Sequence, residues 1–217
     1  MLQKRGYGLV LLLVASSIVF QMAAEGTGVI RWVTILLQAA TLVAAVRTAG
    51  PHRAGVRVAS GVAALVALLS LVVLIVHGEI PEAPTAIVSG LLVAVAPAVL
   101  AGGLVRAVRE QHAITLHTLS GVLAIYLLIG MFFAFVYGAV ESIDQGTLFA
   151  QVSNASPADR MYFSFVTMCT VGYGDLTLIG NLPRSLAVGE MLIGQIYLVT
   201  VVALIVANMG RARRAEG

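Results

Sequence analysis

Long runs of apolar residues, separated by short polar connections, follow one another along the whole chain. Six such runs can be distinguished, and each is near the ~20 residues that a helix needs to cross about 30 Å of hydrocarbon. They cover approximately residues 7–24, 29–46, 58–76, 86–105, 113–140 and 185–209. The pattern predicts an all-α membrane protein with six transmembrane helices.

The connection between the last two apolar runs is much longer than the others. It covers about residues 141–184 and contains SPADRMYFSFVTMC (156–169) followed by TVGYGD (170–175). Ser156 can cap a helix, Pro157 suits a first helical turn, and Asp159 favours the positive end of a helix. Because such a helix is too short to span, we expect a re-entrant helix followed by an extended return, enclosed by protein or water.

The composition agrees with a membrane location. Hydrophobic residues make up 59% of the 217-residue chain and charged residues 11%, whereas soluble domains are about one quarter charged. The net charge of +3 is dispersed in short tracts between the apolar runs, so we expect no nucleic-acid partner. Cys169 is the single cysteine, which excludes an internal disulfide.

Basic residues occur in alternate connections. Ten of the thirteen Lys and Arg residues fall on one side of a six-span arrangement: Lys4, Arg5, Arg47, Arg53, Arg57, Arg106, Arg109, Arg211, Arg213 and Arg214. The positive-inside rule then predicts a multi-pass plasma-membrane protein with both termini cytoplasmic and residues 141–184 outside. The first run also has the character of a secretory signal, which charge counting does not exclude. We interpret it as a span.

The segment TVGYG has the residues that a dehydrating ion pathway needs. Stripping water from a monovalent cation requires stacked oxygen ligands, and backbone carbonyls can serve if successive ones point to one side. That arrangement demands unusual dihedral angles at alternate residues, which Gly172 and Gly174 adopt readily. The hydroxyl of Thr170 can add one more oxygen at the inner end.

Residues 170–175, Thr-Val-Gly-Tyr-Gly-Asp, resemble the selectivity-filter signature of the potassium channel superfamily. Thr167 extends the match upstream, and RSLAVGEMLIGQIYLVTVVALIV downstream is similar to the inner helix of bacterial channels; the specific resemblance covers about residues 157–209. It implies K⁺ as the permeant ligand, bound by Thr170, Val171, Gly172, Tyr173 and Gly174. A chance Gly-x-Gly loop is the alternative.

The resemblance also implies the architecture. Residues 111–217 would form the pore domain, with an outer helix, a pore helix, the filter and an inner helix. Residues 1–110 would form a four-helix domain shaped like a voltage sensor but without its gating arginines. Because the chain carries one filter motif and a pore needs a ring of ligands, we expect a homotetramer in contact with membrane lipid.

Further residues are assigned supporting roles. Asp175 would tie the filter mouth to Tyr162, although aromatic packing of Tyr162 is equally open, and Thr167 and Glu190 would support the filter from the pore helix and inner helix. Gly194 is a candidate hinge or a close-packing glycine. We expect Cys169 to be a small buried packing residue. The expected cavity face of the inner helix comprises Gln195, Leu198, Val202 and Val206.

Strong voltage gating is not expected. The run at 86–105 holds no charged residue, and Arg106 and Arg109 follow only at its end. About 8 residues follow the last run, which argues against a cytoplasmic ligand-binding domain. The stimulus therefore stays open among protons, lipid, a partner and constitutive opening, with His117 as a candidate pH reporter.

Two other classes of function are alternatives to a channel. The first is a non-conducting or regulatory subunit that keeps the pore fold and needs a partner. The second is an intramembrane enzyme with Ser120 as nucleophile and His117 as base, but no further histidine or acid completes such a site. We therefore expect a passive channel without enzymatic activity or cofactor.

Overall fold

The computed structural model describes residues 6–23, 28–50, 53–78, 82–111, 116–144 and 146–203. Its helices are α1 (Gly6–Ala23), α2 (Gly28–Ala49), α3 (Arg53–His77), α4 (Glu82–Gln111), α5 (Leu116–Asp144), α6 (Pro157–Met168) and α7 (Asn181–Ile196), which a π-helix, η2 (Tyr197–Val202), continues. Six helices are long and apolar enough to cross a membrane, which confirms the six expected spans within the described residues. The protein is all-α, as predicted.

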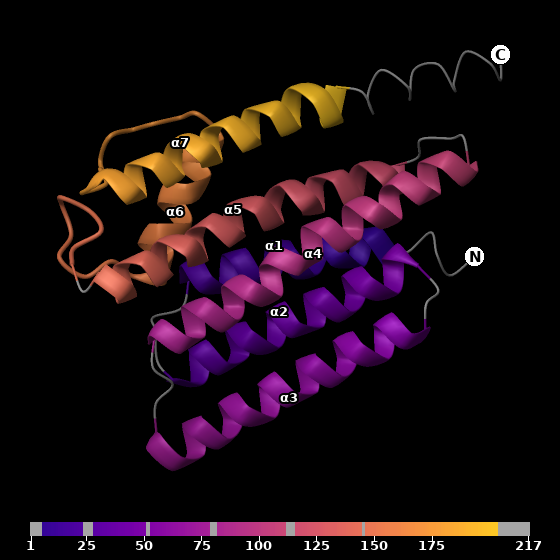
Figure 1. Ribbon diagram of the computed structural model, residues 1–217, viewed down its shortest axis with the longest axis horizontal. Helices are drawn as coiled ribbons and strands as arrows, with labels where there is room; N and C mark the ends of the chain where they lie inside the picture. Colours follow the sequence, from indigo (N-terminus) through magenta and orange to yellow (C-terminus); the bar gives the residue numbers. More distant parts are fainter. Residues whose placement is uncertain are drawn as a thin grey trace.

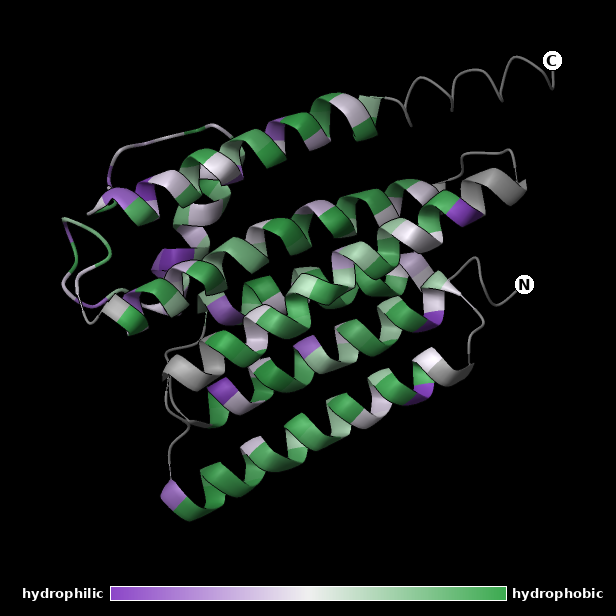
Figure 2. Cartoon of the chain, in the orientation of Figure 1, coloured by the Kyte–Doolittle hydropathy of each residue, from purple (hydrophilic) through white to green (hydrophobic). Residues whose placement is uncertain are grey.

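The long helices run side by side, and the short α6 lies at one end of the bundle between α5 and α7 (Figure 1). Helix α2 packs against α1, α3 and α4, while α5 packs against α1, α4, α6 and α7. Helix α3 lies at the edge, where it contacts α2. Apolar residues cover the long helices along most of their length (Figure 2), as expected for helices that contact lipid.

One apolar core joins the two halves of the chain. Its buried members include Val10 of α1, Leu42 of α2, Leu100 of α4, Leu128 of α5 and Met161 of α6. The core therefore crosses the expected boundary between residues 1–110 and 111–217. The division into two domains stays a prediction.

Small residues allow close backbone approach where α2 and α4 cross. A Cβ atom added at Gly103 would lie 2.4 Å from Cα of Ala49, so the two backbones are almost in contact there. Close approach of this kind favours helix association in lipid, where burial of apolar surface supplies little driving force between helices.

The last long helix differs from its prediction in two ways. It begins at Asn181 rather than near residue 185, because Pro183 fits in a first turn. Its hydrogen bonding then changes to the π pattern over Tyr197–Val202, which the apolar pattern did not indicate. Val206 lies outside the described residues.

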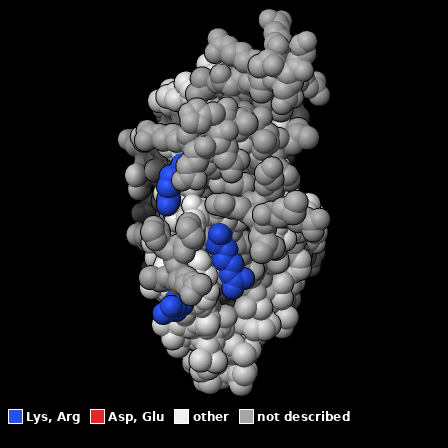
Figure 3. Space-filling view, turned by 90° about the vertical axis from the view of Figure 1, so that its right-hand side faces the viewer, with Lys and Arg blue, Asp and Glu red and all other residues white. Residues whose placement is uncertain are grey.

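One end of the bundle is basic. Helix α1 starts and η2 ends at the same end of the molecule (Figure 1), where α2 ends with Arg47 and α4 carries Arg106. Viewed from that end, the charged atoms of the described residues are all Lys or Arg (Figure 3). The connection holding α6 and TVGYGD lies at the opposite end.

Candidate functional site

The short helix α6 is set by local sequence signals, as predicted. The hydroxyl oxygen of Ser156 accepts a hydrogen bond from the backbone N–H of Asp159 at 3.1 Å, and Ser156 N–H donates to the Asp159 carboxylate at 2.9 Å. Pro157 occupies the first turn. This reciprocal capping box fixes the start of the helix, and the helix ends at Met168.

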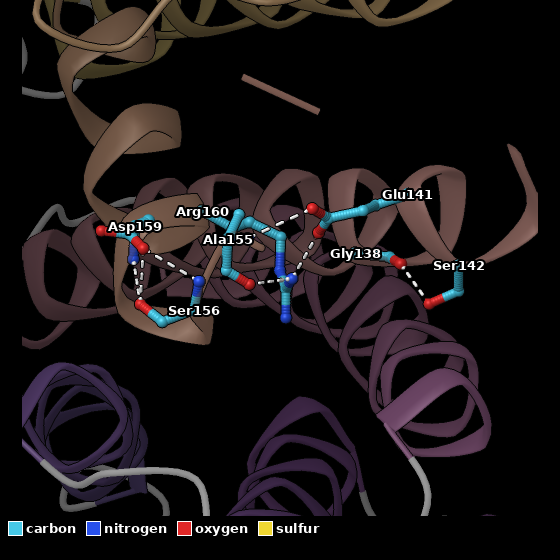
Figure 4. A network of polar contacts seen from close by, with 7 residues as sticks. All are labelled: Gly138, Glu141, Ser142, Ala155, Ser156, Asp159 and Arg160. Carbon is cyan, nitrogen blue, oxygen red and sulfur yellow. Dashed lines mark hydrogen bonds and ion pairs between the residues drawn. The ribbon is translucent and has the colours of Figure 1, made fainter. Parts of the chain in front are cut away.

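A buried ion pair anchors the same helix to α5 (Figure 4). Nη1 of Arg160 lies 2.7 Å from Oε2 of Glu141 and donates to the carbonyl oxygen of Ala155 at 2.7 Å. The backbone N–H of Ala155 donates to the other Glu141 oxygen at 3.3 Å. The first turn of α6 is thereby tied to the C-terminal end of α5 and to the preceding loop. Sequence reasoning did not identify this pair.

The return segment after α6 has alternating backbone handedness. Its φ angles are +57° at Thr170, +56° at Gly172 and +79° at Gly174, whereas Val171 and Tyr173 between them have negative φ. This alternation is what turning every carbonyl to one side requires. Positive φ is strained for a β-branched residue such as Thr170, and such strain is characteristic of functional backbone.

One side of this segment is open in the single chain. A Cβ atom added at Gly172 or Gly174 would meet no other atom within 4 Å, and Val171 is exposed. The Tyr173 side chain is 71% exposed but lines a recess of about 390 Å³ with Tyr162 and other residues of α6. The described residues of a single chain therefore leave the segment uncovered at Gly172 and Gly174.

The end of the TVGYGD segment is tied to α6 by a side-chain hydrogen bond. The hydroxyl of Tyr162 donates to the carboxylate of Asp175 at 2.8 Å, so the expected pairing is present. The bond to Asp175 raises the pKa of Tyr162 above its ordinary value, because the phenol that donates is stabilised relative to phenolate. The contact therefore persists into alkaline solution.

A buried acid joins three helices behind the segment. Glu190 of α7 is completely buried and accepts a hydrogen bond from Tyr137 of α5 at 2.6 Å. Ser164 of α6 lies in hydrogen-bond contact with the other Glu190 oxygen and, at 2.7 Å, with the carbonyl oxygen of Gly130. The bracing contact expected for Glu190 is present, with two partners that were not anticipated.

The number of hydroxyl hydrogens in this cluster indicates which groups donate and which accept. Ser164 has one hydroxyl hydrogen, yet its oxygen faces two acceptors, the Gly130 carbonyl and Glu190. Every group is satisfied when Ser164 donates to Gly130 and accepts from a Glu190 carboxyl that carries a hydrogen. Tyr137 then donates to the remaining Glu190 oxygen.

The inner helix packs closely against the end of α6. A Cβ atom added at Gly194 would lie 2.5 Å from Cγ of Met168 and 3.0 Å from its carbonyl oxygen, so the close-packing alternative describes this glycine. Gln195 Nε2 donates to the same carbonyl at 3.4 Å. A hinge at Gly194 stays a prediction.

The expected cavity residues differ in their surroundings. Leu198 is half-buried, and Val202 packs against the core, whereas the neighbouring Val199 is 68% exposed.

The expectation that Cys169 is buried was wrong: the residue is exposed, because the chain leaves the helix there. Its sulfur lies 3.4 Å from the hydroxyl of Tyr126.

The loop after the filter segment pairs with the loop before α6. Phe149 and Leu178 form an antiparallel bridge, with Ala150 N–H donating to Thr177 and Ile179 N–H to Leu148 at 2.9 Å each. Leu178 is buried at this point. No local sequence signal identified this pairing.

Comparison with known proteins identifies the part of the chain that holds this site. An ion channel family matches residues 121–211, which include most of α5, α6, the TVGYGD segment and α7. The inward rectifier potassium channel Kirbac3.1 of Paramagnetospirillum magnetotacticum is 34% identical over 90 residues, which are 40% of this chain and 28% of that protein. Protein LctB of Bacillus caldotenax is 31% identical over 96 residues, which are 41% of this chain and 70% of that protein. No solved structure matches.

The family match therefore coincides with the site, whereas α1–α4 lie outside the matched region. The matches point to a transporter of ions rather than to an enzyme. With six apolar helices and an ion channel region, the chain is a multi-pass membrane protein and belongs to the potassium channel superfamily.

Proposed function

We propose that this chain forms a K⁺-selective channel in which four copies surround one axis. K⁺ passes between the backbone oxygens of residues 170–174, with Thr170 at the inner end. The observation that carries this proposal is the alternation of positive and negative φ from Thr170 to Gly174, since it brings carbonyl oxygens to one side of the segment. The similarity to an inward rectifier potassium channel supports the choice of ion.

The need for four copies follows from the open side of the segment. One chain supplies one wall of oxygen ligands, which cannot replace the hydration shell of an ion. One face of α7 and η2 is also uncovered, with Leu192 and Ile196 of α7 and Val199 of η2 exposed. In the homotetramer this apolar face meets the neighbouring subunit and the axial cavity.

The remaining site residues hold this geometry. Tyr162 and Asp175 fix the outer mouth. The backbone carbonyl of Thr167 accepts a hydrogen bond from the backbone N–H of Thr170 at 3.0 Å, and Glu190 joins the inner helix to the pore helix.

Below the filter, Gln195, Leu198 and Val202 line the cavity in this proposal. Gly194 allows the inner helix to bend when the inner end opens.

Orientation and gating follow from the charges. The basic end of the bundle faces the cytoplasm, and the filter faces outward across the plasma membrane. Between Ile87 and Val105, α4 carries no charged residue. Each charge crossing the field would gain about 2.3 kcal/mol per 100 mV, so this helix gives the channel weak voltage dependence at most.

Flux in liposomes tests the proposal. The purified chain is reconstituted with a K⁺ gradient, and flux is followed with Ba²⁺ as blocker and Na⁺ as substitute. We expect Ba²⁺-sensitive K⁺ flux and little Na⁺ flux. Gly172→Ala should abolish selective flux because φ is +56° there, whereas Gly61→Ala, at a helical glycine of α3 with open surroundings, should leave it unchanged.

Two results would contradict the proposal. Equal K⁺ and Na⁺ flux would show that the segment is not a selective filter. Absence of flux in every lipid and at every pH would favour the alternative of a silent subunit that needs a partner.

A further inference from the structure

A long groove separates α3 from α1 on the surface of α2. Its volume is about 880 Å³, within the ~300–1,000 Å³ typical of small-molecule sites. Helix α1 contributes Leu9 and Leu13 to one wall, α2 forms the floor with Val43, and α3 contributes Ala63 and Ala67. The small side chains on α3 leave the space open, while the indole N–H of Trp32 donates to the Ala67 carbonyl and holds α3 beside α2.

The groove has the depth of one membrane leaflet. Along α2 its lining extends from Leu36 to Thr48, and those 12 steps at about 1.5 Å each span roughly 18 Å. The hydrocarbon core of a bilayer is about 30 Å thick, so the groove covers about half of it. It runs from mid-membrane to the basic end of the bundle.

Two guanidinium groups lie at the mouth of the groove. Arg47 lines it directly, and no acidic side chain among the described residues pairs with Arg47. Gly50 also lines the mouth, and Nη1 of Arg106 lies 3.2 Å from the position of a Cβ added there. Charged atoms visible on this face belong only to Lys and Arg among the described residues (Figure 3).

We propose that this groove binds one anionic phospholipid of the leaflet at the basic end. One acyl chain lies along Leu9, Leu13 and Val43, and the phosphate meets Arg47, whose planar guanidinium can donate two parallel hydrogen bonds to it. Arg106 adds positive charge next to the same headgroup. The site depends on membrane embedding and not on K⁺ selectivity, so it stands even if the filter proposal fails.

Lipid binding to the full-length protein tests this site. The protein in detergent is titrated with phosphatidylglycerol and, separately, phosphatidylcholine of the same chain length, and bound lipid is counted by native mass spectrometry. We expect phosphatidylglycerol to bind at least tenfold more tightly. Arg47→Gln should remove that preference without altering phosphatidylcholine binding, while Arg57→Gln, an exposed arginine at the same end that does not line the groove, should preserve it.

A second variant tests the apolar part of the site. Ala40 lines the groove and is exposed, so Ala40→Phe should fill the space without disturbing the core and should weaken binding of both lipids. Equal binding of the two lipids by the unaltered protein would overturn the proposal. So would equal losses in Arg47→Gln and Arg57→Gln, which would indicate general attraction to a basic surface, or undiminished binding in a folded Ala40→Phe protein.

Discussion

Some buried polar groups differ between the two halves of the chain, which are called the pore half (α5 to η2, with the proposed filter) and the four-helix half (α1–α4). In the pore half, Glu190 and Arg160 are both buried, and each makes several hydrogen bonds to neighbouring elements. In the four-helix half, the amide of Gln38 is 1% exposed and the hydroxyl of Ser89 is fully buried, and neither has a hydrogen-bond partner among the described residues. A buried polar group without a partner destabilises a fold by about 1–3 kcal/mol.

The difference indicates what each half has to accomplish. The proposed filter must hold backbone oxygens in one geometry, and directional contacts such as Tyr162 to Asp175 specify geometry more sharply than apolar packing does. The four-helix half needs mainly to associate, and close contact of small residues, as at Gly103 and Ala49, suffices for that. Substitution of the partnered groups of the pore half and of the unpartnered Gln38 in the four-helix half should therefore change stability with opposite signs.

The largest stability effect is expected at the ion pair of the pore half. Arg160→Gln removes the partner of Glu141 and leaves a carboxylate that is only 12% exposed, so we expect a loss of about 3–5 kcal/mol in the free energy of unfolding. Denaturant unfolding of the protein in detergent micelles measures it. Arg57→Gln, at an exposed position outside the pore half, is the matched control and should change the free energy by less than about 0.5 kcal/mol.

A double-mutant cycle separates the pair from its surroundings. If the contact in Figure 4 is the main interaction, the loss in Arg160→Gln combined with Glu141→Gln should be clearly smaller than the sum of the two single losses. Strict additivity would contradict the importance of the pair and would weaken the contrast between the halves.

A smaller effect is expected at Glu190, where two substitutions distinguish charge from hydrogen bonding. Glu190→Ala leaves the hydroxyls of Tyr137 and Ser164 without their shared partner and should lower stability by about 2–3 kcal/mol. Glu190→Gln supplies a permanent N–H donor to Ser164 and a carbonyl acceptor for Tyr137, so its effect should stay below about 1 kcal/mol.

Thermal unfolding of the protein in detergent and K⁺ flux in liposomes together measure the effects of the two substitutions. If Glu190→Gln lowered stability as much as Glu190→Ala, the cluster would require the negative charge of Glu190. The assignment of a hydrogen to the Glu190 carboxyl would then be wrong.

Features that depend on neighbouring residues could be predicted from the sequence. The capping box of Ser156 and Asp159 lies within one helical turn, and the glycines that adopt positive φ stand two residues apart. The six spans follow from apolar runs that need no knowledge of their partners. Each of these features is determined by residues close together in the sequence, so the sequence was enough to predict it.

Features that depend on contacts between distant residues were missed or misjudged. Ser164 meets Glu190 across 26 positions and Arg160 meets Glu141 across 19, and nothing in either neighbourhood specifies the partner. The exposure of Cys169 and the contact of Gly194 with Met168 depend on where α6 ends relative to α7. Only the packing of the helices determines these relations.

The smallest effect, of opposite sign, is expected in the four-helix half. Gln38→Leu removes a buried amide without a partner among the described residues, and apolar replacement should raise the free energy of unfolding by about 1 kcal/mol. Thr41→Val, one turn further along α2, is the matched control: Thr41 is buried and already donates to the Leu37 carbonyl at 2.8 Å, so its removal should bring no gain. Both are measured by the same denaturant unfolding. A loss in Gln38→Leu would mean that the amide has a partner in the assembled channel, and the four-helix half would then share the directional contacts that distinguish the pore.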